Sequence, residues 1–192
     1  MKDIILIGGG GHCKAVIDVI EQEGRFKIIG IVDNSELLDK NVLGYPAIGN
    51  DSELKNLVKG CKNAIITIGQ ISSPSKRISL FDKILKLGFT LPSVVSPRAY
   101  VSKHANIGKG SVIMHDAVIN AGAIVGDNCI VNTNALVEHE SVIGHHCHIS
   151  TNAVINGGVV LGNGSFIGSG AVTKENIRID SNFFAKAGSV VK

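Results

Sequence analysis

The chain has 192 residues, of which 44% are hydrophobic and only 4% aromatic, with 23 glycines and no tryptophan. This length is enough for one large domain or two small ones, whose cores must consist mainly of aliphatic side chains. The 19 basic and 16 acidic residues are mixed along the chain, so no basic run could follow a nucleic-acid backbone, and we expect no nucleic-acid partner.

The first segment begins with four apolar residues at positions 4–7, too short a run for a secretory signal or a membrane span. We therefore expect a cytoplasmic protein without membrane insertion. Residues 1 to about 90 alternate short apolar stretches with helical ones, which indicates a small doubly wound, Rossmann-like α/β domain. The pattern predicts strands at 4–7, 28–32 and 65–68, and helices at 12–23 and about 75–87.

Four glycines at positions 8–11 connect the first predicted strand to the first helix. Backbone N–H groups and the positive end of a helix dipole meet at such a turn, which favours a phosphate. Cys13 occupies the third glycine position of a dinucleotide fingerprint, so a nucleotide diphosphate fits better than a full nicotinamide cofactor. Asp33 ends the second strand, where its carboxylate can accept hydrogen bonds from a ribose or base. The alternative is a tight turn followed by a capped loop.

From residue 95 onward the sequence repeats with a period of six residues, without insertion or deletion. The fifth position of each repeat is small except at Val159. This pattern predicts short strands joined by turns, with three repeats in each triangular coil and residues eighteen apart stacked on one another. The first positions, all aliphatic, are Val95, Val101, Ile107, Ile113, Ile119, Val125, Val131, Val137, Ile143, Ile149, Ile155, Leu161 and Ile167.

The register continues more loosely to the end of the chain, where Phe183 and Phe184 are predicted to close the apolar end of the column. We therefore predict two domains, over residues 1–92 and 93–192.

The Glu-His-Glu run at positions 138–140 is the strongest candidate for chemistry. A carboxylate beside His139 can orient the imidazole and raise its basicity for proton abstraction. The residues eighteen positions before and after Glu138 are Asn120 and Asn156, so stacking predicts that its carboxylate lies between two amides. The alternative is that His139 is one of several surface histidines.

A metal site formed by the nearby His145, His146, His148 and Cys147 is disfavoured, because their positions in the repeat make the side chains diverge. Cys147 and Cys129 are eighteen residues apart at inward positions, so we expect buried thiols. We expect neither disulfides nor an acyl-cysteine intermediate.

The whole chain resembles the hexapeptide-repeat sugar acetyltransferases of the sialic-acid O-acetyltransferase and bacillosamine N-acetyltransferase type. The resemblance rests on the strand followed by Gly-Gly-Gly-Gly-His at 8–12, on Asp33, on Ile68-Gly69, on Asn132, on the Glu-His-Glu run and on the uninterrupted repeats. It implies a left-handed parallel β-helix, acetyl-CoA as cosubstrate without a metal, and a homotrimer with active sites between neighbouring subunits.

The resemblance also implies roles for individual residues. His139 would be the general base, Glu140 would increase its basicity, and Asn132 and Glu138 would support the site. The nucleotide of an activated amino sugar would bind at Gly10, Gly11, His12, Asp33, Asn34 and Gly69. Acetyl-CoA would contact His148, Ser169 and Ala187, the last standing where a glycine is usual.

We therefore predict an acetyltransferase that moves an acetyl group directly from acetyl-CoA to the amine of a nucleotide-linked sugar, of the UDP-4-amino sugar type, in bacterial glycan biosynthesis. One alternative is O-acetylation of sialic acid or a related sugar. An alternative of another class is a noncatalytic scaffold that binds a nucleotide sugar.

Overall fold

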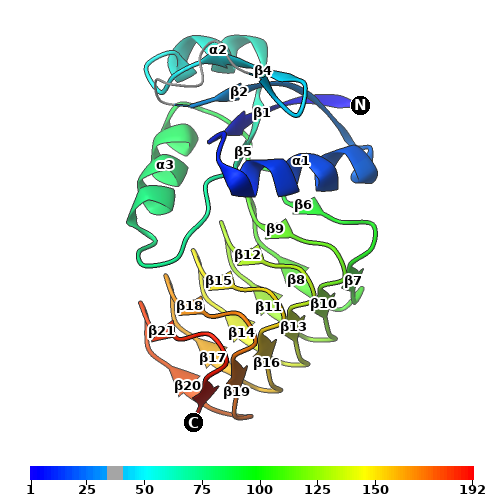
Figure 1. Cartoon of the computed structure of the whole chain (residues 1–192), viewed down its shortest axis with the longest axis vertical. Coiled ribbons are helices and arrows are strands. Elements are labelled where there is room, and N and C mark those ends of the chain that lie inside the picture. Colours follow the sequence, from blue (N-terminus) through cyan, green and yellow to red (C-terminus); the bar gives the residue numbers. More distant parts are fainter. Residues whose placement is uncertain (34–40) are drawn as a thin grey trace.

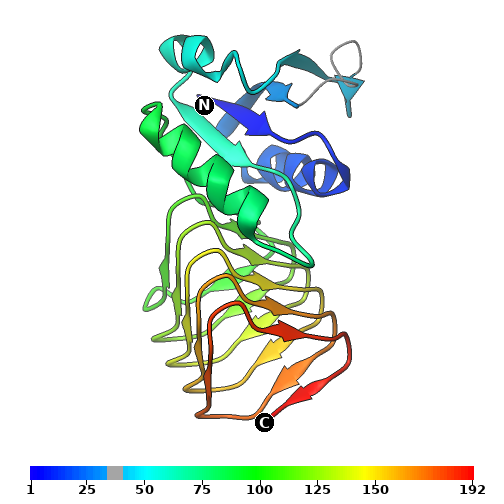
Figure 2. The ribbon, with the colours of Figure 1, turned by 90° about the vertical axis from the view of Figure 1, so that its left-hand side faces the viewer.

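A computed structural model describes residues 1–33 and 41–192. An α/β part lies at one end, and a column of coils made of parallel strands extends from it to the C-terminus (Figure 1, Figure 2). The predicted fold class, a Rossmann-like domain followed by a β-helix of six-residue repeats, is confirmed. Asn34, predicted to contact the nucleotide, lies outside the described residues.

The α/β part is built on a five-stranded sheet with the order β3-β4-β2-β1-β5, in which only β3 runs antiparallel to its neighbour. Its strands are β1 (Lys2–Ile7), β2 (Phe26–Val32), β3 (Asn41–Val42), β4 (Tyr45–Gly49) and β5 (Asn63–Ile66). Its helices are α1 (Gly11–Glu23), α2 (Leu54–Gly60) and α3 (Ser75–Lys86).

The first two predicted strands and both predicted helices are confirmed to within two residues at each end. The predicted third strand also agrees to within two residues at each end, with both ends shifted toward the N-terminus, since β5 runs from Asn63 to Ile66. The sequence pattern did not indicate α2 or the β3–β4 hairpin. Both are short, and Pro46 within β4 weakens the strand signal, since proline cannot donate to a sheet.

Three parallel sheets form the column, and each is named here by one strand. The β15 sheet contains β6 (Val94–Val95), β9 (Val112–Ile113), β12 (Ile130–Val131), β15 (His148–Ile149), β18 (Phe166–Ile167) and β21 (Phe184–Ala185). The β13 sheet contains β7 (Tyr100–Val101), β10 (Val118–Ile119), β13 (Leu136–Val137), β16 (Val154–Ile155), β19 (Val172–Thr173) and β22 (Val190–Val191). The β14 sheet contains β8 (Asn106–Ile107), β11 (Ile124–Val125), β14 (Val142–Ile143), β17 (Val160–Leu161) and β20 (Arg178–Ile179).

The register within each sheet is the one that the period predicts. Val118 pairs with Leu136, and Ile130 pairs with His148, so partners are eighteen residues apart. The aliphatic first positions and small fifth positions from Ile113 to Ala171 are buried inside the column. Cys129 and Cys147 are among these interior residues as free thiols, as predicted.

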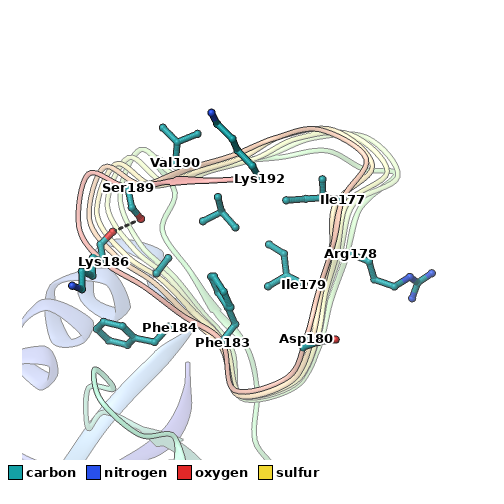
Figure 3. Close-up of a pocket in the computed structure, with 12 residues that line it drawn as sticks. Ile177, Arg178, Ile179, Asp180, Phe183, Phe184, Lys186, Ser189, Val190 and Lys192 are labelled. Atoms are coloured by element: carbon teal, nitrogen blue, oxygen red, sulfur yellow. Dashed lines mark hydrogen bonds between the residues drawn. The ribbon is translucent and has the colours of Figure 1, made fainter.

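The far end of the column differs from the prediction. Phe183 points into the interior, but Phe184 points outward, where its ring stacks on that of Phe166 at a centroid distance of 5.1 Å (Figure 3). Because Phe184 falls at an outward position of the repeat, only Phe183 contributes to closing the end. A cavity of about 530 Å³ remains there, lined by the last coil.

The α/β part packs on the outer face of the β15 sheet. Val94, Val112 and Met114 of the first coils are at most 2% exposed and share one apolar cluster with the inner face of α1. In Figure 3, which looks along the column, the α/β part lies beside the side that carries Phe184. The corner where the other two sheets meet lies opposite that side. Among the described residues, no helix has the length and apolar character needed to cross a bilayer.

Candidate active site

The Glu-His-Glu run lies in the turn between β13 and β14, at the corner of the column that faces away from the α/β part. The side chain of His139 is 63% exposed, and its Nδ1 lies 3.6 Å from Oε2 of Glu140. A cavity of about 570 Å³ opens beside the imidazole, lined by Glu138, His139, Asn156, Gly157, Glu175 and Asn176. The structure thus places the imidazole and both carboxylates at the surface, with Glu138 and His139 lining the cavity.

Glu138 is held by hydrogen bonds on one side only. Its Oε2 accepts from Nδ2 of Asn120 at 2.7 Å and from the backbone N–H of His139 at 3.2 Å. The predicted second amide contact is wrong, because Nδ2 of Asn156 donates to the carbonyl of Thr173 at 2.7 Å. Thr173 also accepts the backbone N–H of Asn156 through its hydroxyl, so the next coil satisfies this residue instead.

His148 and Asn132 lie together on the β15 sheet. The His148 side chain is buried, with its Nδ1 2.6 Å from the carbonyl of Gln70 and its Nε2 3.3 Å from Nδ2 of Asn132. A carbonyl can only accept, so Nδ1 carries the proton and Nε2 receives the amide of Asn132. Burial lowers the pKa of His148 to about 4, which keeps the ring neutral at physiological pH.

Ser169 and Ala187 are exposed at the corner that follows the β15 sheet. They are eighteen residues apart and therefore stacked, and the Ser169 hydroxyl lies 2.9 Å from that of Ser150. The structure thus gathers the predicted acetyl-CoA contacts, together with Asn132, along one side of the column. It does not bring them to His139, which lies at the opposite corner of the same chain.

Apart from Asn34, the predicted nucleotide contacts gather at the carboxyl ends of β1, β2 and β5, where parallel strands present their following residues at one edge. An oxygen of Asp33 accepts the backbone N–H of Gly9 at 2.5 Å. Gly10 and Gly11 face open space, since a methyl group added to either would meet no atom within 4 Å. Gly69 approaches from the β5 side, where an added methyl would lie 3.8 Å from Cβ of His12.

His12 connects this glycine turn to the column. Part of its side chain is exposed, but Nε2 is buried and has no hydrogen-bond partner in the described part of the chain. Burial, followed by the charges of Arg77 and His148, lowers the pKa of His12 to about 3. The imidazole of His12 is therefore neutral at physiological pH, with its Nε2 directed into the buried region that also holds Arg77 and His148.

Sequence reasoning missed Arg77, Gln70 and Asn128, which lie between the α/β part and the column. Arg77 falls within an amphipathic helix and Asn128 at a corner of the repeat, so neither position carries a local signal of a shared site. Within residues 1–33 and 41–192, no group of three histidine, cysteine, aspartate or glutamate side chains is arranged to hold a metal ion.

Two family models match the chain: the PglD N-terminal domain over residues 3–84, and the bacterial transferase hexapeptide (six repeats) over residues 104–139 and 140–175. Among solved structures, the acetyltransferase domain of PglB from Neisseria gonorrhoeae FA1090 is 32% identical, with a TM-score of 0.92, over 100% of this chain and 92% of that one. The chain belongs to the hexapeptide-repeat sugar acetyltransferases.

Two further solved structures are similar to the chain. PerB from Caulobacter crescentus, in complex with CoA and GDP-perosamine, is 33% identical, with a TM-score of 0.92, over 100% of this chain and 89% of that one. WeeI from Acinetobacter baumannii AYE shares the fold, with 20% identity and a TM-score of 0.77 over 100% of this chain and 97% of that one. No sequence among curated proteins matches the chain significantly.

Proposed function

We propose that the chain transfers an acetyl group from acetyl-CoA to the amine of a nucleotide-linked amino sugar. The observation that carries this proposal is the exposed His139, flanked by Glu138 and Glu140 at a cavity, in a member of a sugar acetyltransferase family. Solved relatives support both substrates: one PglB domain structure holds acetyl coenzyme A, and PerB holds CoA with GDP-perosamine.

In the proposed reaction, the amine nitrogen attacks the thioester carbonyl carbon and the new C–N bond forms. His139 removes a proton from the nitrogen as general base, and a backbone N–H stabilises the oxyanion. The C–S bond then breaks, and the CoA sulfur leaves with the proton that His139 returns. No covalent intermediate on the enzyme is needed, which agrees with the buried state of Cys129 and Cys147.

Residues 1–92 would hold the nucleotide and residues 93–192 would carry out the transfer. The phosphates would lie against the N–H groups of Gly10 and Gly11 at the start of α1, with the exposed part of the His12 side chain as a further contact. The free oxygen of Asp33 would accept a hydrogen bond from the ribose or base.

The proposed active site requires a homotrimer. His139 lies at the corner between the β13 and β14 sheets, whereas His148 lies on the β15 sheet, which forms the opposite side of the triangular column. Neighbouring subunits in a closed ring would place the His139 corner of one column against the His148 side of the next. Each site would then combine residues of two chains.

The first experiment compares His139→Ala with His104→Ala, which removes another exposed histidine of the column. CoA release would be measured with UDP-, dTDP-, GDP- and CMP-linked amino sugars, and with free sialic acid as hydroxyl acceptor. We expect His139→Ala to lower kcat by about two to four orders of magnitude and His104→Ala to leave it unchanged. Near-normal turnover in His139→Ala would remove this histidine from the mechanism. If CoA is released with sialic acid but with none of the amino sugars, the reaction is O-acetylation. If no CoA is released with any of these acceptors, the protein is a noncatalytic scaffold.

The second experiment tests assembly by complementation. Subunits carrying His139→Ala and subunits carrying His148→Ala should each be nearly inactive alone. If the two variants exchange subunits at equal concentration, about one quarter of the interfaces regain both histidines, and activity returns to about that fraction of the wild-type value. Absence of recovery in mixed trimers, verified by mass spectrometry, would place both histidines in a site within one chain.

A further inference from the structure

Arg77 is the largest fully buried side chain of the described residues, at 1% exposure. Its Nη1 donates to the carbonyls of Ile66 at 3.3 Å and Ile68 at 2.6 Å. Its Nη2 donates to the carbonyl and to Oδ1 of Asn128, at 3.2 Å and 2.6 Å. Burial lowers the pKa of Arg77 to about 10, so the group remains a cation at neutral pH.

The partners of this cation are neutral oxygens rather than carboxylates. The carbonyl oxygens of Ile66 and Ile68 belong to the end of β5 and the residues just after it, in the α/β part. The two oxygens of Asn128 belong to a corner of the column. In the described part of the chain, no carboxylate forms an ion pair with Arg77. Burying a charge costs free energy unless it is well hydrogen-bonded, so the oxygens of both parts must keep these positions around the guanidinium.

A chain of hydrogen bonds connects Arg77 to His148. Nδ2 of Asn128 lies 3.0 Å from Nδ1 of His146, and the carbonyl of His146 accepts Nε2 of Gln70 at 3.1 Å. The carbonyl of Gln70 in turn accepts Nδ1 of His148 at 2.6 Å. Gln70 follows Ile68 by two residues in the chain. The hydrogen bond from Arg77 to the carbonyl of Ile68 therefore also holds the segment immediately before Gln70.

We propose that Arg77 is a positioning residue for acetyl transfer, which fixes the segment before Gln70 against the column and thereby sets the position and the tautomer of His148. The inference rests on the proposed function, in which His148 contacts acetyl-CoA. With Nδ1–H directed to Gln70, the lone pair of Nε2 faces Asn132 and the ring stays in one orientation.

The charge of Arg77 also supplies a readout that packing alone would not change. Burial is the larger cause of the low pKa of His148, and the guanidinium lowers it further. The guanidinium also lowers the pKa of His12 on α1, and so does the charge of a protonated His148. Removing the cation should therefore raise the pH at which both rings titrate, because the protonated forms lose a repulsive neighbour.

The test compares wild type, Arg77→Met and Arg77→Lys by side-chain ¹⁵N NMR of the histidines and by steady-state kinetics at several pH values. In wild type, we expect a neutral His148 with the proton on Nδ1 down to about pH 4. In Arg77→Met, we expect titration at higher pH, mixed tautomers and a KM for acetyl-CoA raised about tenfold. Arg77→Lys keeps the positive charge but loses the planar guanidinium with its two sets of donors. It should therefore bring the titration pH of His148 back toward the wild-type value more fully than the KM for acetyl-CoA.

Two controls separate positioning from general loosening. Arg98→Met removes an exposed arginine that pairs with Asp116, at 59% side-chain exposure. Asp18→Asn weakens a different link between the α/β part and the column, the 2.7 Å contact from Asp18 to His115. Neither should move the His148 signal or the KM for acetyl-CoA. An equal effect of Asp18→Asn would overturn the proposal.

A further variant covers the case in which Arg77→Met does not fold. Asn128 has a φ of 54°, so Asn128→Gly keeps the backbone and removes the amide that receives Arg77 and contacts His146. A changed His148 signal in this variant supports the proposal. An unchanged signal and KM in the folded variants would overturn it. Failure of the proposed function would show separately, as absence of CoA release by wild type with every acceptor.

Discussion

The imidazole of His139 lies directly against the backbone of Gly157, one coil further along the column. A methyl group on Gly157 would lie 2.8 Å from Cε1 and 2.9 Å from Nε2 of His139, closer than side chains pack. The two residues are eighteen positions apart, so His139 occupies the space that a side chain at 157 would otherwise fill. The glycine therefore sets where the proposed general base can stand.

Replacing Gly157 by alanine should displace the His139 ring without disturbing the column. A displacement of about 1 Å at a reacting group costs about 10²-fold, so we expect kcat to fall by about that factor while the far-UV circular dichroism stays unchanged. Gly60→Ala is the matched control, since a methyl there meets no atom within 4 Å. Wild-type kcat in Gly157→Ala would show that the ring can work from another position.

We expect Glu140 to lower the stability of the fold and to increase the activity of the site. Its φ of 58° is left-handed, a conformation that asparagine or glycine adopts at most equivalent corners of the repeat. Glu140→Asn should therefore raise the free energy of unfolding by about 1 kcal/mol. It should lower kcat/KM by less than about tenfold, because the contact with His139 is solvent-exposed.

The reverse substitution, Asn152→Glu, tests the stability part of that prediction at an exposed corner with a φ of 57°. Urea unfolding should show a loss of about the same size as the gain at Glu140. Changes of the same sign in the two variants would contradict the backbone explanation.

Stability should fall in acid before the carboxylates titrate. The folded-state pKa values of His12 and His148 are lowered to about 3 and about 4, whereas a histidine in the unfolded chain has its ordinary pKa of about 6.5. Below about pH 6.5 the unfolded chain therefore binds protons that the folded chain does not. Each group should remove about 1 kcal/mol per pH unit from the free energy of unfolding, down to its folded pKa.

Urea unfolding between pH 7 and pH 4.5 measures this slope. Replacing His12 and His148 together by asparagine should flatten it, whereas His104→Asn, at an exposed position, should not. An unchanged slope in the double variant would show that other groups cause the acid sensitivity.

The interior of the column should reject a larger side chain at a fifth position. Ala135 is fully buried next to the aliphatic first positions. Ala135→Leu should lower the free energy of unfolding by about 1–3 kcal/mol, measured by urea denaturation, because the added atoms force neighbours apart. Ala121→Leu, at an exposed corner, should change it by less than about 0.5 kcal/mol. Equal effects at the two sites would contradict the packing explanation.

Most of the column could be predicted from the sequence because each residue meets neighbours eighteen positions away. This rule correctly placed Cys129 and Cys147 inside and joined Asn120 to Glu138. It fails where a side chain has two possible partners, as for Asn156, whose amide turns to Thr173.

In the α/β part, the glycine turn and Asp33 could be located from the strand and helix pattern, because parallel strands place their carboxyl ends at one edge. The β3–β4 hairpin and α2 could not, because short elements that depend on neighbouring packing carry little periodicity.

Which side of the column the α/β part covers was decided only by the tertiary structure. The contacts from Arg77 to Asn128 and from His148 to Gln70 join residues 51 and 78 positions apart, and no repeat relates them. Their geometry comes from the packing of α1 and α3 on the outside of the coils, which local patterns do not encode. The separation of His148 from His139 follows from the repeat itself, because nine residues are half of an eighteen-residue coil. The packing of the α/β part adds what the repeat does not encode, the contact with Gln70 that orients the buried His148 ring.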